Sequence, residues 1–333
     1  MAIEPAAVAF VVGAVVCLAT SWVLVSRLEM VGERFGFSEA LLGLVAALAA
    51  DTPEITAAVT ALARHERAVG AGVVLGSNAF NLAALLGLGA VVAGRLDLHR
   101  RVVLLGGAVA VWMAAVSLVT VTRLVVPGVG LVLVLAVLAA YTGALAGHRT
   151  LLRRAPLPAS WVNWVASAVD EEELELVVAI RPRRATPRDT VTAVIALGVV
   201  VAAAIAMERG ASSFGRHYAV PDVVVGGLVL AAVTSLPNAV AAVYLASKGR
   251  GAAAFSTALN SNTLNVVAGL VLPATVLGLA KPSGPTVLVA AAYVGLTVLT
   301  LALAYGDSGL RRSGGWLIMV GYAAFVATLV SVS

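Results

Sequence analysis

The chain reads GLVAALAADTPEITAAV at residues 43–59 and LGSNAFNLAALLGL at residues 75–88, and both segments occur a second time. The second copies are GLVLAAVTSLPNAVAAV at 227–243 and LNSNTLNVVAGLVL at 259–272. A constant offset relates the copies without a gap, since Pro237 and Pro53, for example, are 184 positions apart. Ala, Val and Leu agree readily in any apolar helix, but a shared proline and a shared Ser-Asn-x-x-Asn do not. The chain therefore contains one structural unit twice.

The composition is that of a membrane protein. Apolar residues make up 61% of the 333 residues and charged residues only 12%. Apolar runs of about 20 residues, long enough to cross the hydrocarbon core of a bilayer, recur along most of the chain. The sequence therefore predicts an all-α integral membrane protein with about ten transmembrane helices. The predicted spans cover residues 5–26, 38–63, 68–93, 102–122, 125–146, 190–207, 221–246, 253–279, 285–305 and 314–331.

The two copies are expected to face opposite ways across the membrane. The first copy starts in the second span and the second copy in the seventh, and an odd number of crossings between them reverses the direction of the chain. Inverted repeats are typical of secondary transporters, whose substrate site lies near the bilayer midplane between the repeats. We expect two five-helix units, 1–146 and 190–333, joined by a cytoplasmic loop at 147–189. Trp161 and Trp164 predict a short interfacial helix in this loop.

The basic residues are expected to set the orientation of the chain. The net charge of +5 comes from 22 Lys and Arg against 17 Asp and Glu, and this excess lies in the connections between spans. There it orients the helices in the lipid bilayer and does not indicate a nucleic-acid partner. One side of the membrane receives six basic residues, which are Arg64, Arg67, Arg123, Arg209, Arg216 and Lys281. The other side receives the remaining 16 of the 22. Because Lys and Arg are enriched on the cytoplasmic side, we expect a cell-membrane protein with both termini outside the cytoplasm.

Residues for several other functions are missing from the sequence. Cys17 is the only cysteine, so no intramolecular disulfide can form. The four histidines are not grouped as metal ligands, and there is no Walker-type phosphate loop. An intramembrane hydrolase would need a nucleophile and a base, or a zinc ligand set. No enzyme activity and no cofactor are therefore expected, and transport would draw on an ion gradient.

Two acidic residues lie at bilayer depth in the first repeat. Charged groups there cost roughly 2.5 to 3.5 kcal/mol on insertion scales and usually face a partner or a water-filled cavity. Asp51 and Glu54 are three residues apart, which places both on one face of a helix. Pro53 lies between them and has no N–H group, so it leaves a carbonyl one turn earlier without its helical donor. Carboxylates beside free carbonyls are the ligands of a hard cation.

Neutral oxygen ligands recur around these acids. Ser77 and Asn81 are four residues apart in the next span and share a face. The second repeat places Thr234, Ser235, Asn238, Ser261 and Asn265 in the same arrangement. The absence of Cys and His there excludes a site for soft metals. All nine residues are candidate cation ligands: Glu54, Asp51, Ser77, Asn81, Thr234, Ser235, Asn238, Ser261 and Asn265.

Other polar and small residues have simpler interpretations. Gly72, Gly76 and Gly227 are interpreted as positions of close helix packing. The segment 64–67 is interpreted as a solvated turn between the second and third spans.

Both repeats resemble the alpha repeats of the sodium/calcium exchanger family of cation antiporters. The segment VTSLPN, with Thr234 to Pro237, is similar to that family's Thr-Ser-Leu-Pro-Glu, and Gly76 to Asn81 is similar to its Gly-Ser-Asn-x-x-Asn. The resemblance implies exchange of Ca²⁺ for Na⁺, with peripheral helices moving against an ion-binding core. It places the family's acidic ligand on Glu54, and its polar ligands on Ser77, Asn81 and the five candidate positions of the second repeat.

The sequence departs from the family pattern at the acids. Asn238 stands where a second glutamate is expected, and Asp51 stands where the first repeat would carry a serine. In one account Asp51 substitutes for the missing glutamate, so the site still neutralises a divalent ion. In the other account Asp51 and Glu54 share a proton, and the site exchanges a monovalent cation for protons.

The predicted function is a secondary active cation antiporter with its ion site at the bilayer midplane. The expected cargo is Na⁺ and Ca²⁺, and H⁺ or another monovalent cation is the alternative that uses the Asp51 and Glu54 pair. A cation channel is the weaker alternative, because paired inverted broken helices are more typical of alternating access.

Overall fold

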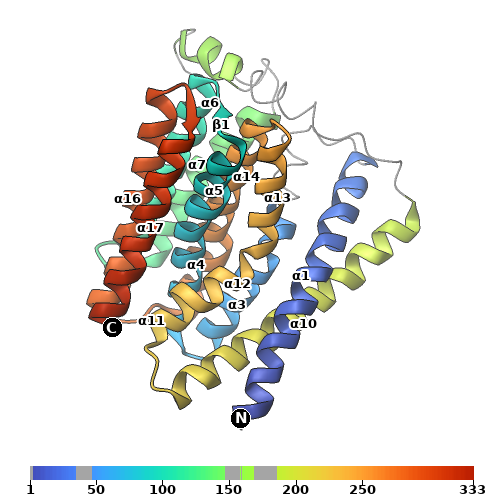
Figure 1. The fold of residues 1–333 in the computed structure, drawn as a ribbon, viewed down its shortest axis with the longest axis vertical. Helices are drawn as coiled ribbons and strands as arrows, with labels where there is room; N and C mark the ends of the chain where they lie inside the picture. The colour runs from blue at the N-terminus through green and yellow to red at the C-terminus, as the bar shows by residue number, and fades with distance from the viewer. Residues whose placement is uncertain (1–2, 35–46, 147–157, 159, 169–185) are drawn as a thin grey trace.

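The computed structural model describes residues 3–34, 47–146, 158, 160–168 and 186–333. Its first half contains α1 (Ile3–Arg34), α3 (Thr52–Ala63), α4 (Arg67–Asn81), the π-helix η1 (Leu82–Gly87), α5 (Leu88–Ala93), β1 (Arg95–Asp97), α6 (Arg100–Val121) and α7 (Pro127–Ala146). Its second half contains α10 (Pro187–His217), α11 (Asp222–Val224), η2 (Val225–Leu230), α12 (Ala231–Thr234), α13 (Leu236–Ser247), α14 (Gly251–Leu264), η3 (Asn265–Val271), α15 (Leu272–Leu277), α16 (Gly284–Gly306), β2 (Gly309–Arg311) and α17 (Arg312–Val332). Figure 1 shows a bundle of long helices, with α1 and α10 crossing at one side.

The all-α membrane fold is confirmed. Within the described residues, seven helices are long and apolar enough to cross a membrane, or eight if the bent pair Asp222–Thr234 and Leu236–Ser247 is one span. The segment 251–277 is helical as well, but Asn260, Asn262 and Asn265 reduce its mean hydropathy. Part of the second predicted span, 38–46, lies outside the described residues. The count of ten crossings therefore stays a prediction.

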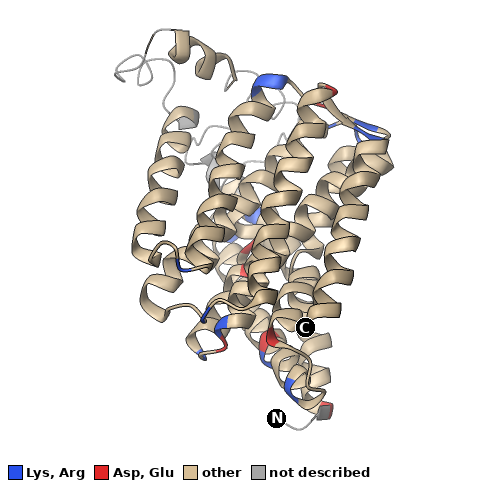
Figure 2. Ribbon diagram, turned by 90° about the vertical axis from the view of Figure 1, so that its left-hand side faces the viewer, with Lys and Arg blue, Asp and Glu red and all other residues tan. Residues whose placement is uncertain are grey.

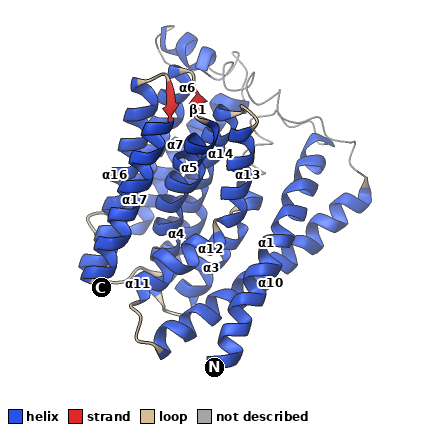
Figure 3. Ribbon diagram, in the orientation of Figure 1, coloured by secondary structure: helices blue, strands red, loops and turns tan. Residues whose placement is uncertain are grey.

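Short strands are the exception to the helical fold. β1 pairs antiparallel with β2, with Leu96 opposite Leu310. Figure 3 shows the two strands together at one end of the bundle. Figure 2 shows that Lys, Arg, Asp and Glu occupy little of the long helices, as lipid contact requires.

The two repeats run in opposite directions. In Figure 1 α11, α12 and α13 follow one another from the lower to the upper end of the bundle. α4, α5 and β1 also rise to the upper end, so α3, which precedes α4, descends to the lower end. The broken helix of the first repeat is therefore antiparallel to that of the second.

The helices of the repeats form the core. In the apolar stretch of Arg67–Ala93, 89% of the residues are buried, whereas in those of α1, α7 and α17 only 22% are. Glycine makes this packing possible, as predicted for Gly72, Gly76 and Gly227. A Cβ atom at Gly76 would overlap the backbone of Gly227, and one at Gly72 would lie 2.9 Å from the nitrogen of Gly227. The backbones of α4 and η2 are therefore in direct contact.

The helices α1 and α10 pack against each other through an apolar cluster that includes Cys17, Leu24, Val200 and Ala204, and Ala49 next to α3 joins this cluster. A Cβ at Gly13 would lie 2.9 Å from the carbonyl oxygen of Ala203, so these helices also approach closely.

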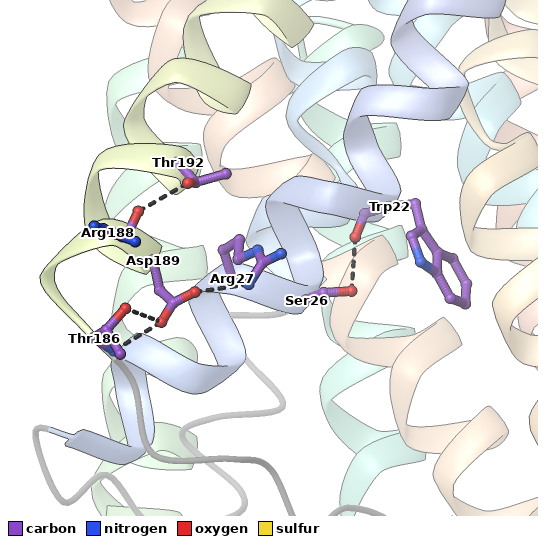
Figure 4. Close-up of polar contacts among 7 residues, drawn as sticks. All are labelled: Trp22, Ser26, Arg27, Thr186, Arg188, Asp189 and Thr192. Atoms are coloured by element: carbon purple, nitrogen blue, oxygen red, sulfur yellow. Dashed lines mark hydrogen bonds and ion pairs between the residues drawn. The ribbon is translucent and has the colours of Figure 1, made fainter.

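Polar contacts join the two helices at one end. Arg27 Nη1 lies 2.7 Å from Asp189 Oδ1, and Asp189 Oδ2 accepts from the backbone and hydroxyl of Thr186 to cap α10 (Figure 4). The hydroxyl groups of Ser26 and Thr192 donate within their own helices, to the carbonyl groups of Trp22 and Arg188.

The connecting segment 147–189 is described only in part. Residues 160–168 are helical, as predicted, and Trp161 and Trp164 on this helix are 66% and 37% exposed. Residues 147–157, 159 and 169–185 of the predicted cytoplasmic loop lie outside the described residues. The sixth predicted span, 190–207, is too short. α10 continues to His217 because Glu208, where the apolar run ends, is buried and paired with Arg64 at 3.8 Å.

Candidate cation site

Two broken helices contribute the acidic and hydroxyl groups. Asp51 directly precedes α3, and Ser235 directly precedes α13. These equivalent residues have nearly the same backbone angles, φ −83° and ψ −2° for Asp51 and φ −83° and ψ −3° for Ser235. Pro53 and Pro237 follow two residues later, and neither can donate a backbone hydrogen bond. The same break therefore occurs in both repeats.

The predicted site residues are buried in the core. Asp51, Glu54, Ser77, Asn81, Ser235, Ser261 and Asn265 have no exposed surface, and Thr234 and Asn238 are each 2% exposed. They come from α3, α4, α12, α13, α14 and η3 and the residues next to them. Buried carboxylates without an internal partner are costly, so their contacts decide what the site can do.

Each carboxylate is hydrogen-bonded to the other repeat. Ser235 Oγ donates to Glu54 Oε1 at 3.0 Å, and Asn238 Nδ2 donates to Asp51 Oδ1 at 2.7 Å. With the offset of 184 residues, position 51 corresponds to 235 and position 54 to 238. The two hydrogen bonds are therefore related by the internal symmetry, and each joins one acid to one neutral group.

A hydroxyl group extends the contacts of Asp51. Ser261 Oγ donates to Asp51 Oδ1, and Asn81 Nδ2 donates to Ser261 Oγ at 3.2 Å. Asn238 Nδ2 also lies 3.4 Å from Ser261 Oγ. Two groups of the second repeat thus converge on one carboxylate, and Asn81 of the first repeat is linked to it through Ser261.

Two further asparagines, which the sequence analysis did not assign to the site, hold the repeats together. Asn78 Nδ2 donates to the carbonyl of Asn262 at 3.0 Å, and Asn262 Nδ2 donates to the carbonyl of Asn78 at 3.1 Å. Their side-chain oxygens accept from Asn265 Nδ2 and Asn81 Nδ2, respectively. Both are the first asparagine of the repeated Ser-Asn-x-x-Asn, and this recurrence in the sequence could have identified them.

The hydrogen bonds of two predicted ligands run to the main chain. Ser77 Oγ donates to the carbonyl oxygen of Ala231 at 3.5 Å, and Thr234 Oγ1 donates to that of Leu230 at 2.9 Å. Ser77 and Thr234 thus make no hydrogen bond to the carboxylate of Asp51 or Glu54.

Four buried oxygen atoms in this region have no hydrogen-bond partner: Asp51 Oδ2, Glu54 Oε2, Asn81 Oδ1 and Asn265 Oδ1. All four are electron-pair donors, so a bound cation would satisfy them. In the described part of the chain, no group of three or more His, Cys, Asp and Glu side chains is placed to hold a metal ion. The ligand set is one of carboxylate, amide and hydroxyl oxygens, which suits hard cations.

Membrane-spanning helices, inverted broken segments and buried oxygens at their junction define the class of multi-span cation transporters. Residues 5–146 and 189–331 match the family model described as sodium/calcium exchanger protein. The chain therefore belongs to the sodium/calcium exchanger family, and this family consists of transporters.

Similar proteins agree with this membership. The crystal structure of an H⁺/Ca²⁺ exchanger named CAX has a TM-score of 0.69 at 13% identity, and the match covers 99% of this chain and 86% of that one. The sodium-calcium exchanger NCX_Mj has a TM-score of 0.62 at 18% identity, over 99% of both chains. These low identities establish the shared fold alone. A protein described as "Putative antiporter CaxA", from Alkalimonas amylolytica, is 35% identical over 89 residues, so the match spans 26% of this chain and 28% of that protein.

Proposed function

We propose that the chain is a secondary active antiporter that moves Ca²⁺ in exchange for Na⁺ or H⁺, with the cation bound at the bilayer midplane between the repeats. The observation that carries the proposal is the set of four buried, unpartnered oxygens of Asp51, Glu54, Asn81 and Asn265. Ca²⁺ takes roughly six to eight oxygen ligands, and carbonyl groups and water supply those that side chains do not.

The charge of the site supports a divalent cargo. The second repeat has Asn238 where the resemblance to the family predicts an acid, but Asp51, the hydrogen-bond partner of Asn238, is an additional acid in the first repeat. The site thus keeps two carboxylates, and in the ionised state they balance a divalent cation. Both accept hydrogen bonds from the second repeat, and the other oxygen of each is left for the ion.

The counter-ion would compete for the same oxygens. Na⁺ is also a hard cation, and protons neutralise the carboxylates and thereby release Ca²⁺. The α1 and α10 pair lies at the side of the bundle, which suits movement of this pair against the core. Such movement would open the site to one side of the membrane at a time.

A monovalent cation/proton antiporter is the second candidate. The observation that favours it is that both acids come from the first repeat, three residues apart and wholly buried. Two carboxylates so arranged can share one proton, which leaves a single negative charge for a monovalent ion.

The test is exchange by purified protein in sealed liposomes. ⁴⁵Ca²⁺ uptake is measured with an outward Na⁺ gradient, with an outward H⁺ gradient and with neither. We expect uptake only with a gradient, and a matched efflux of the driving ion. Asp97→Asn is the control variant, because that carboxylate is 85% exposed at the end of the bundle.

The alternatives give different results in the same assay. Sodium or potassium exchange for protons without any Ca²⁺ movement would support the second candidate. Ca²⁺ flux that needs no counter-ion would identify a channel and contradict antiport.

We also propose that the protein lies in the cell membrane with both termini outside the cytoplasm, as the distribution of basic residues favours. Because Cys17 is the only cysteine and is buried, single cysteines placed at the two ends can be labelled selectively. Labelling of intact cells by an impermeant maleimide at both ends is expected. Protection at both ends would reverse the assigned orientation.

A further inference from the structure

A cavity of about 510 Å³ lies away from the cation site, where α4 and α7 begin and α6 and α15 end. Its lining includes Arg67, Thr120, Arg123, Gly128 and Gly278. No Asp or Glu is among the described residues that line it. The cavity is thus basic, and none of the nine candidate cation ligands lines it.

Several hydrogen-bond donors of this cavity are unused. Thr120 is fully buried, and its hydroxyl oxygen has no hydrogen-bond partner. Arg67 Nε is buried and also lacks a partner. One nitrogen of the Arg123 guanidinium donates to the carbonyl oxygen of Leu279 at 2.8 Å. Arg123 has a φ of 59°, the left-handed conformation that often follows a helix C-terminus, and it stands directly after the last turn of α6.

The first turn of α7 adds one backbone donor. Helix N-termini leave backbone N–H groups without intrahelical acceptors, and they carry a partial positive charge. α7 begins at Pro127, which has no N–H, and the N–H groups of Val129 and Gly130 donate to the carbonyl oxygen of Val126. The N–H of Gly128 is left for a ligand, and Gly128 lines the cavity with no atom within 4 Å of the position that a Cβ would take. The open space therefore borders a helix N-terminus as well as two guanidinium groups.

The internal symmetry explains why this space is open. Adding 184 to the numbers of β1 gives 279–281, and subtracting 184 from those of β2 gives 125–127. The two strands therefore close one end of the bundle, whereas Val125, Val126, Pro127 and Leu279 at the equivalent place line the cavity. Pro127 stands at the position equivalent to Arg311 of β2, and proline cannot donate to a ladder.

We propose that this cavity binds the phosphate group of an anionic ligand. Two guanidinium groups, a free hydroxyl and a helix N-terminus together provide charge-assisted hydrogen bonds for phosphate oxygens. The phosphate can come from a phospholipid headgroup or from free phosphate. The surroundings favour the lipid, because Leu124, Val126 and Val276 are 77%, 64% and 85% exposed next to the cavity and suit contact with acyl chains.

The test measures ligand binding to delipidated, detergent-purified protein by native mass spectrometry and thermal unfolding. The probes are phosphatidylglycerol, phosphatidylcholine and inorganic phosphate. We expect phosphatidylglycerol to bind and raise the melting temperature, and phosphatidylcholine to bind more weakly. Binding of inorganic phosphate in place of the lipid would identify a free anion as the ligand. No preference among the three probes would overturn the proposal.

Variants locate the binding in the cavity. Arg67→Gln and Arg123→Gln should each weaken phosphatidylglycerol binding by about tenfold, since a charge-assisted hydrogen bond contributes roughly 1.5–3 kcal/mol. Arg209→Gln is the matched control, because it removes one exposed positive charge elsewhere. Equal affinity in Arg67→Gln, Arg123→Gln and Arg209→Gln would overturn the proposal.

A variant that fills the cavity distinguishes loss of lipid binding from loss of folding. Gly128→Leu places a side chain in open space and removes no charge. We expect it to fold with unchanged helicity and to lose the selective binding. Full lipid binding by this variant would place the ligand elsewhere.

Discussion

The two buried acids, Asp51 and Glu54, both come from the first repeat, and each accepts a hydrogen bond from a neutral side chain of the second. Each symmetry-related pair, Glu54 with Ser235 and Asp51 with Asn238, has one carboxylate and one hydrogen-bond donor. The resemblance to the family's Thr-Ser-Leu-Pro-Glu predicts an acid at position 238, where this chain has Asn238. In the structure, Asp51 accepts a hydrogen bond from Asn238, so this pair contains one acid after all. The acid comes from the first repeat instead of the second.

Neutralising the first acid should stop transport. Glu54→Gln retains shape and can still accept from Ser235, but it removes one charge from a fully buried site. We expect exchange to be lost and Ca²⁺ affinity to fall by about tenfold or more, which is about 1.4 kcal/mol per factor of ten. Calorimetric titration and ⁴⁵Ca²⁺ uptake measure this, with thermal unfolding as the folding control. Normal exchange in Glu54→Gln would remove this residue from the site.

Transferring the second charge should be tolerated better than deleting it. Asp51→Asn alone leaves two amides at this pair and is expected to weaken Ca²⁺ binding by about tenfold or more. The double variant Asp51→Asn with Asn238→Asp restores an acid beside an amide donor, so it should recover most of the lost affinity. If the double variant binds no better than Asp51→Asn, the two positions do not share one charge. Titration of all three proteins with Ca²⁺ makes the comparison.

At the scale of elements, the breaks in the helices follow the repeat. Pro53 and Pro237 lie in the first turns of α3 and α13, directly after equivalent breaks, and the α12–α13 helix bends by 48° at its break. The π-helices η1 and η3 likewise occupy nearly equivalent positions, next to Asn81 and Asn265. π-helical turns are rare and are frequent at functional sites. The sequence signalled the proline breaks but not the π-helices.

Glycine at the contact of α4 and η2 should be essential to the fold. Gly76→Ala introduces a Cβ that overlaps the backbone of Gly227, so the helices must separate. We expect a loss of roughly 1–3 kcal/mol in the free energy of unfolding. Gly198→Ala is the matched control, since nothing lies within 4 Å of its Cβ position, and it should be neutral or slightly stabilising. Thermal unfolding in detergent compares them, and equal melting temperatures would contradict the packing argument.

At the scale of the whole molecule, a polar cluster fastens α10 to the turn between α3 and α4. Arg216 Nη1 lies 2.7 Å from Glu66 Oε1, and Arg64 contacts both Glu66 and Glu208. Ser212 Oγ donates to Glu208 Oε1 at 3.0 Å. Segment 64–67 is therefore a turn with Arg64 and His65 exposed, as interpreted from the sequence, and the structure adds that this turn binds Glu208, a buried residue distant in sequence.

This attachment should depend on pH. Partial burial raises the pKa of Glu66, but Ser212 and the charges of Arg64 and Arg216 outweigh it and lower this pKa below its usual value of 4.5. The contribution to stability is therefore complete above pH 4.5 and is lost as the pH falls through the lowered pKa. Glu66→Gln should reduce the free energy of unfolding by about 1 kcal/mol at pH 7, with a smaller difference in acid.

Melting curves from pH 7 down to pH 4 test this, and Glu4→Gln, which alters an exposed glutamate, is the control. A Glu66→Gln difference that does not change with pH would show that the carboxylate charge is not what holds α10.

The sequence by itself determined the membrane class and the repeat, because apolar runs and a constant offset can be read directly from the residues. It also predicted the inversion, from the odd number of predicted crossings between the copies. It also indicated the buried residues, since Pro53, Pro237 and the two Ser-Asn-x-x-Asn segments recur in register.

Only the tertiary structure decided which side chains meet. It paired Asp51 with Asn238 and Glu54 with Ser235, joined Asn78 to Asn262, and placed Glu208 beside Arg64. These partners are more than a hundred residues apart in sequence, so no local pattern specifies their contact. Their distances depend on how closely the glycine-lined backbones approach, and that is a property of the packed bundle.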